Sequence, residues 1–373
     1  MKEIIIDNRE SGQRFDKYLK KYLSQAGSGF IYKMLRKKNI TLNGRKASGN
    51  EILSEGDSVK MFFSDDTYEK FTAGAPKREN EARIRKNDLA VNGENAAEKN
   101  NKLSEQYGSA HQGDKRHNKN AHKILDNMEL TIGNTNGKKI VICAGYRVEI
   151  LYEDDNVIFM NKPAGLLSQG DGKGGVSLVD ILSSYLDYTD GRSGKPSGFR
   201  PGICNRLDRN TSGVVAAGKT VRGLQELSEA IRTKTVHKIY ACVVEGRVDT
   251  GKRLKGYLTK DSVKNTVSLS DVKTEGAAYV ETIYRPVKTN GLVTLLEVEL
   301  VTGKSHQIRA HMANEGHPVV GDVKYGSKMK QPGGHQLLHA HRMVFDNMGR
   351  LPDSIAGLVI EAGIPAHYNK FFD

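Results

Sequence analysis

The stretch NRLDRNTSG, residues 205–213, runs directly into the apolar residues VVAA at 214–217. A short apolar run bounded by glycines is typical of a buried strand, so this stretch predicts a polar loop followed by a central strand. In the loop, Asp208 stands between Arg206 and Arg209. Guanidinium groups on both sides favour the ionised form of a carboxylate, and an ionised aspartate can act as a nucleophile. A purely structural, ion-paired turn is the alternative interpretation of this pattern.

Apolar runs that are typical of strands recur on both sides of this stretch, between residue 139 and the C-terminal end. They lie at 148–152, 157–160, 240–244, 278–282 and 292–300. Apolar residues with helical spacing occur at 177–186, 221–232 and 306–315. Because the strands outnumber the helices and are irregularly spaced, we expect an α+β domain with a mixed, largely antiparallel sheet and flanking helices.

A second polar motif, TGKSHQIRAH, occupies residues 302–311. Its two histidines, His306 and His311, are five positions apart, which is a poor spacing on a helix for two ligands of one metal ion. We therefore interpret both histidines as core or helix-capping residues.

Two glycine motifs match nucleotide-binding patterns in form only. Residues 213–220 fit the phosphate-loop pattern GxxxxGKT, but a phosphate loop needs exposed backbone N–H groups after a strand, and here VVAA is the predicted strand itself. Residues 170–175 fit GxGxxG, but residues 161–165 separate them from the preceding strand, whereas the dinucleotide motif needs its glycines at the strand end. We interpret 170–175 as a glycine-rich surface loop, and an NTPase is the weakest of the functions considered.

Residues 1–65 predict a separate, small α/β module. A strand is expected at 3–6, helices at 14–23 and 30–37, a hairpin at 39–46 and a further strand at 58–62. The hairpin is indicated by Asn43-Gly44, since Asn-Gly is a favoured dipeptide for a two-residue hairpin turn.

The chain is basic, with 57 Lys and Arg against 44 Asp and Glu, a formal net charge of +13 and a pI near 9.4. Between residues 14 and 46, ten basic residues stand against one acid, Asp16. Like charges destabilise a compact module, so this excess favours contact with RNA or DNA over an ordinary solvated surface. The ten are Lys20, Lys21, Lys33, Arg45 and Lys46, together with our candidate RNA contacts Arg14, Lys17, Arg36, Lys37 and Lys38.

Residues 66–138 separate this module from the large domain at 139–373 and differ from both in composition. Of the 47 residues at 76–122, five are Val, Ile, Leu, Met, Phe, Trp or Tyr. Such a segment cannot bury enough apolar surface to offset the chain entropy lost on folding. We therefore expect a disordered, polar linker.

The composition also argues against several classes of protein. The chain has no run of about 18 apolar residues, and residues 1–10 lack the apolar core of a signal peptide, so neither a membrane protein nor a secreted protein is expected. The three cysteines form no CxxC pair, which argues against a structural zinc site or a disulfide framework. We expect a cytoplasmic protein and, since no signal for self-association is present, a monomer.

Several motifs, in this order along the chain, together resemble the RluA-type pseudouridine synthase family. They are ILYEDDNVIFMNKPAGLLS from Ile150, NRLDRNTSG from Asn205, KIYACVVEG from Lys238, TGKSHQIRAHMANEGHPVVGDVKYG from Thr302 and LHAHRMVF from Leu338. The resemblance covers about 147–373 and 12–62, and it is strongest to the RluC-like branch, which acts on large-subunit (23S) ribosomal RNA. Residues 1–65 resemble the alpha-L RNA-binding module that this branch shares with a ribosomal small-subunit protein.

The resemblance implies an isomerase that converts uridine in RNA to pseudouridine and needs neither a cofactor nor a metal ion. Asp208 matches the family's catalytic aspartate, Arg309 the arginine that pairs with it, and Tyr240 the tyrosine that lies against the target base. Arg206 matches the residue that fills the gap left by the flipped nucleotide, and Ile308 matches a wall of the base pocket. We expect the pair between Arg309 and Asp208 to be bidentate.

Two alternatives to a ribosomal RNA pseudouridine synthase stay open at this point. A non-catalytic RNA-binding or ribosome-assembly protein on the same fold would be free to lose Asp208, Tyr240 and Arg309, and all three are present. A synthase acting on transfer RNA would keep them, and only the resemblance of the basic module favours ribosomal RNA. Asn205 and Asn210 stand where the family often has His and Asp.

Overall fold

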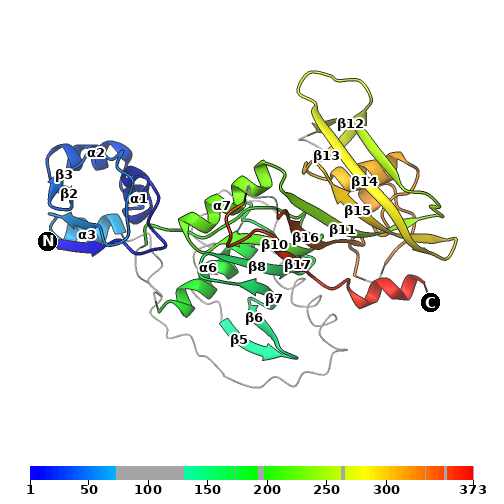
Figure 1. Cartoon of the computed structure of the whole chain (residues 1–373), viewed down its shortest axis with the longest axis horizontal. Coiled ribbons are helices and arrows are strands. Elements are labelled where there is room, and N and C mark those ends of the chain that lie inside the picture. The colour runs from blue at the N-terminus through cyan, green and yellow to red at the C-terminus, as the bar shows by residue number, and fades with distance from the viewer. Residues whose placement is uncertain are drawn as a thin grey trace.

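The structure is a computed structural model, and it describes residues 1–72, 130–172, 174–191, 197–261, 265–331, 333–347 and 351–372. These residues form a small N-terminal module and a large domain built on one extended sheet (Figure 1). The predicted linker lies mainly at 73–129, outside the described residues, so its predicted disorder stays a prediction.

The N-terminal module contains the elements that the sequence predicts. Its strands are β1 (Lys2–Ile5), β2 (Ile40–Leu42), β3 (Arg45–Lys46) and β4 (Ser58–Met61), which form an antiparallel sheet in the order β1-β4-β2-β3. Helices α1 (Phe15–Tyr22) and α2 (Ser28–Arg36) pack against one another and against this sheet. Phe15 and Leu19 of α1, and Ile31 and Leu35 of α2, are four positions apart and so bury one face of each helix.

A third helix, α3 (Asp65–Thr72), extends the module beyond its predicted boundary at residue 65. The ring centroid of Phe71 lies 4.3 Å from that of Phe30, and the hydroxyls of Tyr68 and Tyr22 share a hydrogen bond of 2.6 Å. These aromatic contacts join α3 to the core of the module, although the polar residues around them resemble the start of a linker.

The large domain is built on a single sheet, to which thirteen strands of the described residues belong. They are β5 (Leu130–Thr135), β6 (Lys138–Cys143), β7 (Tyr146–Glu153), β8 (Val157–Lys162), β9 (Gly202–Ile203), β10 (Ser212–Gly218), β11 (Val236–Glu245), β12 (Lys252–Asp261), β13 (Thr266–Ser270), β14 (Ala278–Thr289), β15 (Val293–Leu300), β16 (Leu338–Phe345) and β17 (Val359–Glu361). The main order is β13-β12-β14-β15-β11-β16-β10-β8-β7-β6-β5, with β9 beside β10 and β17 beside β16.

Neighbouring strands of this sheet are antiparallel except for β10 and β16, which pair in parallel. This confirms the predicted mixed, largely antiparallel sheet. The sheet begins before the predicted domain boundary at 139, because β5 pairs along its whole length with β6.

Helices cover both faces of the central strands. Helix α6 (Leu178–Thr189) packs on one face and α7 (Val221–Arg232) on the other, while α8 (Gln307–Asn314) packs beside β13 and β14. In β10, Val215 and Ala217 belong to the core under α6, whereas Val214 and Ala216 belong to the core under α7. A strand buried on both faces is apolar at every position, which explains the uninterrupted VVAA.

Two short 3-10 helices complete the domain, η1 (Val323–Tyr325) after α8 and η2 (Ala366–Phe371) near the C-terminal end. Tyr368 of η2 is buried against Val243 and Val320, which anchors the last residues of the chain. None of the helices in the described parts of the chain combines the length and apolar character needed to span a membrane.

Gly213 makes the close contact between β10 and β16 possible. Its φ is +116°, a conformation that L residues rarely adopt, and its register partner in β16 is Ala340. A Cβ atom at position 213 would lie 2.2 Å from the carbonyl oxygen of Ala340. The parallel pairing at the centre of the sheet therefore requires glycine at this position.

Replacement of Gly213 by alanine is expected to lower the free energy of unfolding by about 3 kcal/mol, because overpacking against β16 adds to the strain of a positive φ. Gly276→Ala is the matched control, since φ is +73° there but no atom lies within 4 Å of the added Cβ. For the control only the backbone strain, about 1 kcal/mol, is expected. Urea-induced unfolding measures both variants, and equal losses would contradict the close-contact argument.

Candidate active site

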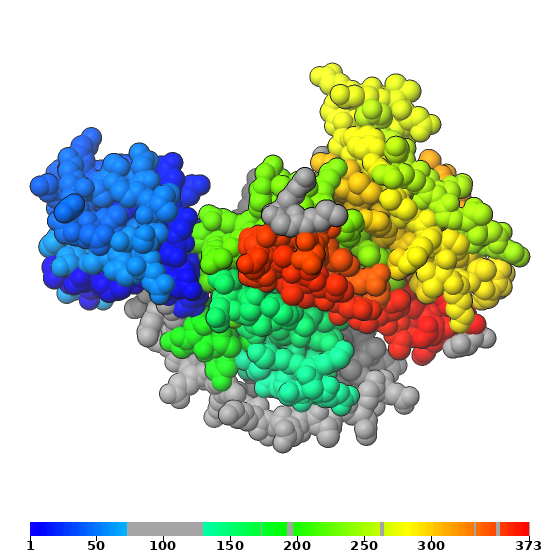
Figure 2. Space-filling view, in the orientation of Figure 1, coloured from blue at the N-terminus to red at the C-terminus, as the bar shows by residue number. Residues whose placement is uncertain are grey.

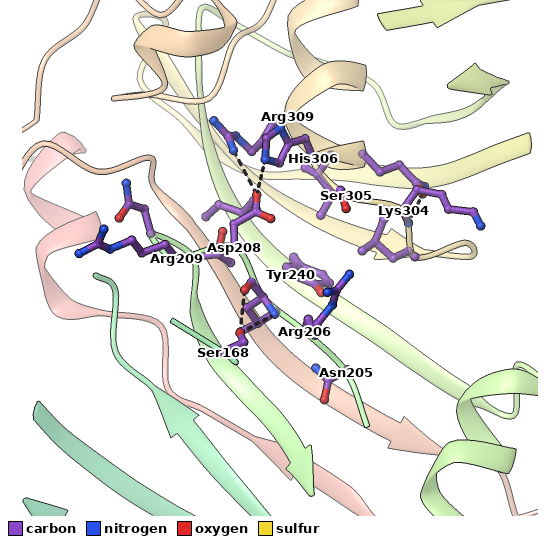
Figure 3. Close-up of a pocket in the computed structure, with 18 of the residues that line it drawn as sticks. Ser168, Asn205, Arg206, Asp208, Arg209, Tyr240, Lys304, Ser305, His306 and Arg309 are labelled. Carbon is purple, nitrogen blue, oxygen red and sulfur yellow. Dashed lines mark hydrogen bonds and ion pairs between the residues drawn. The ribbon is translucent and has the colours of Figure 1, made fainter. Parts of the chain in front are cut away.

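A cavity of about 820 Å³ opens where the loop before β10, the strand β11 and the beginning of α8 meet (Figure 3). All five residues predicted for the catalytic pocket line it, namely Asp208, Tyr240, Arg309, Arg206 and Ile308. They come from three segments far apart in the chain, which the sheet brings together.

The backbone of the Asp208 loop is fixed by the segment that follows β8. Ser168 Oγ donates to the carbonyl of Leu207 at 2.7 Å and accepts from its N–H at 3.0 Å. The N–H of Gly165 donates to the carbonyl of Arg209 at 2.9 Å, and Arg209 Nε donates to the carbonyl of Gly165 at 3.0 Å. Both neighbours of Asp208 are thus held, which fixes the direction in which its side chain leaves the loop.

Lys162, the last residue of β8, ties this segment to the Asp208 loop. Its side chain is fully buried, and Nζ donates to the carbonyls of Pro163 at 3.0 Å, Leu166 at 2.7 Å and Arg209 at 3.0 Å. Burial lowers the pKa of Lys162 to about 7, against the opposing effect of the Asp208 charge. The three acceptors match the three N–H bonds of an ammonium group.

Arg309, on α8, is only 6% exposed and contacts two carboxylates. Its Nε and Nη2 donate to the two oxygens of Asp322 at 2.6 and 2.8 Å, and its Nη1 donates to Asp208 Oδ2 at 3.1 Å. The predicted bidentate pair between Arg309 and Asp208 is therefore wrong, because Asp322 occupies the bidentate edge of the guanidinium. Although burial opposes it, hydrogen bonding to Asp322 and the charges of Asp322 and Asp208 raise the pKa of Arg309.

We predicted a core or helix-capping role for His306. It holds the N-cap position of α8, but its side chain lines the cavity. Its φ is +56°, directly before α8, and its side chain makes no capping hydrogen bond. Nε2 lies 3.7 Å from Asp208 Oδ2, and Nδ1 lies 2.9 Å from the hydroxyl of Tyr325. Burial lowers the pKa of His306 against the opposing charge of Asp208, so the neutral imidazole is favoured at neutral pH. His311 is a core residue, as predicted, and bonds Thr282.

Tyr240, on β11, forms a second wall of the cavity and is 8% exposed. Burial, and then the charge of Asp208, raise the pKa of its phenol, so it stays protonated at neutral pH. A flat, neutral ring close to a carboxylate offers a stacking surface to a planar base that enters the cavity.

Cationic side chains surround the cavity, namely Arg206, Arg209, Lys238, Lys260, Lys304 and Lys324. Lys238 stands two positions before Tyr240, on the same face of β11. Burial, and then the charge of Lys234, lower the pKa of Lys238, and it has no hydrogen-bond or ion-pair partner within the described part of the chain. A desolvated ammonium without a counter-ion is unfavourable, so this wall suits a ligand that carries negative charge.

The other predicted RNA contacts lie on the N-terminal module. Arg14, Lys17, Arg36, Lys37 and Lys38 are exposed there, and none of them lines the cavity. Their role as RNA contacts stays a prediction.

The motif at 213–220 does not have the geometry of a phosphate loop, because most of it is a paired strand. Residues 213–218 belong to β10 and pair with β8, and Lys219 Nζ donates to Glu153 Oε1 at 2.8 Å. Of the second motif, Gly170 and Asp171 border the cavity described above.

Sequence reasoning missed three residues that shape this site, Asp322, Lys162 and His306. A lone acid in GHPVVGDVKYG, residues 316–326, is the one signal for Asp322, and it is weak because such motifs also form simple turns. Lys162 ends β8, whose sequence VIFMNK is apolar up to Met160. A charged residue at the end of a buried strand is a signal of a paired or functional group. For His306, its position three residues before Arg309 was the available clue.

Asp322→Asn is expected to lower the free energy of unfolding by about 3 kcal/mol, because it leaves a buried guanidinium without its bidentate carboxylate. Asp249→Asn is the matched control, since it removes an exposed ion pair with Arg247 and should change stability by less than about 1 kcal/mol. Urea-induced unfolding compares the two. A similarly small loss of unfolding free energy in both variants would show that the buried Arg309 guanidinium does not need the Asp322 carboxylate for stability.

Comparisons with known proteins find a matching family and several similar proteins. Residues 156–314 match the family described as RNA pseudouridylate synthase. The chain is 29% identical over 375 residues to ribosomal large subunit pseudouridine synthase C of Rickettsia felis, with 99% of each chain covered. It is 32% identical over 242 residues to an uncharacterised RNA pseudouridine synthase of Synechocystis sp., covering 62% of this chain and 69% of that protein. A solved structure of human RNA pseudouridylate synthase domain containing 4 is similar with a TM-score of 0.47 and 21% identity, over 59% of this chain and 89% of that one.

Proposed function

The chain belongs to the RluA-type RNA pseudouridine synthases, and we propose that it isomerises specific uridines of large-subunit (23S) ribosomal RNA to pseudouridine. In this reaction the bond between N1 and C1′ breaks, the uracil turns, and C5 joins C1′, so that no atom is gained or lost. The observation that carries the proposal is that Asp208, Tyr240 and Arg309 meet in one cavity lined by cationic side chains.

Asp208 is the proposed nucleophile, acting on the sugar or on the base. Arg309 and His306 both approach its Oδ2, at 3.1 and 3.7 Å, which leaves Oδ1 for the substrate. The side chain of Asp208 is 27% exposed, so a nucleotide in the cavity can reach it. Because Arg309 is itself held by Asp322, the carboxylate is oriented before the substrate arrives.

Tyr240 and Arg206 are proposed to handle the extruded nucleotide. A uracil cannot turn inside a helix, so the nucleotide must leave the stack at a cost of a few kcal/mol. Tyr240 provides a buried ring on which the base stacks, and it is a candidate for the proton step at C5. Arg206 is exposed at the cavity, where its planar guanidinium can fill the place of the missing base.

The choice of ribosomal RNA rests on the N-terminal module and on the relatives. Nine of the ten basic residues between 14 and 46 are exposed, which suits a structured RNA with many phosphates. The Rickettsia felis relative, which is covered over 99% of its length including this region, is named as a large-subunit enzyme. Transfer RNA is the other substrate that the test below includes.

Asp208→Asn is expected to abolish release of tritium from protein-free large-subunit ribosomal RNA labelled at uridine C5. C5 loses its hydrogen only if a carbon–carbon bond forms there, and asparagine is a much weaker nucleophile than a carboxylate. Asp155→Asn, an exposed aspartate of the same domain, is the control and should release tritium like the wild type.

Release by Asp208→Asn at the wild-type rate would refute the role of Asp208. Release by the wild type from transfer RNA but not from ribosomal RNA would refute the proposed substrate. Release from neither RNA would favour the alternative of a non-catalytic RNA-binding protein.

Lys238→Met should raise KM for RNA about tenfold, because one phosphate contact contributes on the order of 1.4 kcal/mol when it is made to a desolvated ammonium. Methionine keeps the packing of the side chain and removes the charge. Lys330→Met removes an exposed lysine that does not line the cavity and should leave KM unchanged. Initial rates at several RNA concentrations measure both, and equal KM values would exclude a phosphate contact at Lys238.

We also propose that the enzyme acts in the cytoplasm and as a monomer. All five proposed catalytic-pocket residues come from one chain, so the site does not need a second copy. Light scattering of the eluted protein should give a mass close to 41.2 kDa, and a dimer mass would contradict this.

A further inference from the structure

The N-terminal module is in direct contact with the large domain (Figure 2). The carboxylate of Glu10, which is 4% exposed, accepts the N–H of Gly198 at 2.8 Å and the hydroxyl of Ser197 at 3.3 Å. Gln13 Nε2 donates to the carbonyl of Gly198 at 3.2 Å. Both backbone groups of Gly198 are therefore bonded to side chains of the module.

Arg9 adds two contacts at the ends of the large domain's helices. The N–H of Val221, the first residue of α7, donates to the carbonyl of Arg9 at 3.0 Å. The guanidinium of Arg9 forms an ion pair with Asp190, at the end of α6. Since α6 and α7 lie on opposite faces of the sheet, the module is attached to two rigid elements and not to one loop alone.

Gly198 also fits sterically against α1. A Cβ atom at position 198 would lie 2.0 Å from the ring of Tyr18. That ring is fully buried and belongs to the core of the module, so it cannot move aside without disturbing the core. The interface has no room for a side chain at this position.

Cations of the module and of the large domain meet at this interface. Lys21 Nζ donates to Gln13 Oε1 at 2.9 Å, and burial, followed by the charges of Arg200 and Lys17, lowers the pKa of Lys21. Lys17 and Arg200 are exposed, whereas the nearby acid, Glu10, is buried and bonded to Gly198. The cluster formed by Lys17, Lys21 and Arg200 therefore exists only while the module is docked.

Arg200 connects this cluster to the cavity. The chain runs from Arg200 through β9 to Arg206, which lines the cavity. Six residue steps in an extended chain span at most about 20 Å. A few nucleotides of RNA can therefore contact the cluster and the cavity at once.

We propose that the docked module and the large domain bind one RNA strand together, with Lys17, Lys21 and Arg200 contacting phosphates of the strand that delivers the target nucleotide to the cavity. The proposal rests on the proposed function, because it takes RNA as the substrate of the cavity. A phosphodiester backbone fits, since it offers one negative charge at each step along a path lined by cations. The module then binds the RNA backbone at a fixed distance from the cavity.

Gly198→Ala tests the docking, because even a methyl group would clash with Tyr18. Gly363→Ala is the matched control in the same domain, at an exposed position where no atom lies within 4 Å of the added Cβ. Small-angle X-ray scattering of the full chain should give a larger radius of gyration for Gly198→Ala and an unchanged one for the control. An unchanged radius for Gly198→Ala would overturn the docking.

RNA binding is then measured over a range of salt concentrations, with a long ribosomal transcript and with a short oligonucleotide that fills only the cavity. For the long RNA, the slope of log K against log salt should be shallower by about 2 in Gly198→Ala, since each of three lost single-strand phosphate contacts contributes about 0.7. For the short RNA, the slope should equal that of the wild type. A slope that becomes shallower by the same amount on both RNAs would overturn the proposal that the module and the large domain bind one strand together.

The double variant Lys17→Met and Arg200→Gln gives a second test that leaves the docking contacts intact. Its radius of gyration should not change. Its slope of log K against log salt on the long RNA should become shallower by about 1.4, because two phosphate contacts are lost. A wild-type slope would overturn the proposal. These readouts are scattering and binding, so a failure of the proposed catalysis is seen separately, as absence of tritium release by the wild type.

Discussion

The guanidinium of Arg309 lies between a buried carboxylate and a carboxylate at the cavity, and the geometry of the site depends on this arrangement. Asp322, which is 2% exposed, fixes the plane of the guanidinium by a bidentate pair, so that Nη1 on the other side of the guanidinium donates to Asp208. A buried ion pair adds little net stability compared with a pair of apolar side chains of similar volume, because the cost of desolvating the charges offsets their attraction. Its consequence here is orientation, because Asp208, the proposed nucleophile, is held by a guanidinium whose plane is fixed.

Much of the fold follows from the sequence because the strands that carry the site are apolar on both faces. The run in β10 indicates burial under α6 and α7 together, and the helices at 177–186 and 221–232 have clear apolar spacing. Strand β12 was missed because Leu254 and Leu258 are its only aliphatic residues, while five of its ten positions are charged. The end of the module was misplaced because Tyr68 and Phe71 make α3 part of its core, despite polar neighbours.

Some residues of the site could likewise be predicted from the sequence, and others could not. Asp208, Tyr240 and Arg309 lie in contiguous motifs, so a resemblance to a family is sufficient to find them. The bidentate pairing could not be predicted, because two carboxylates compete for Arg309 and only the fold decides which of them meets its flat edge. Lys162 likewise bonds backbone carbonyls, and no side-chain pattern in the sequence marks a carbonyl as an acceptor.

The parallel pairing of β10 with β16 has a consequence for the order in which the protein is made. Ser212 and His339 share a hydrogen bond of 2.8 Å across 127 positions, and Gln336 likewise donates to Thr211 beside the Asp208 loop. Contacts of such sequence separation form late in folding. On a translating ribosome, the Asp208 loop therefore lacks its last supports until the strand around residue 340 has emerged. Until then, the nascent chain has no fully supported site with which to modify the RNA of the ribosome that is producing it.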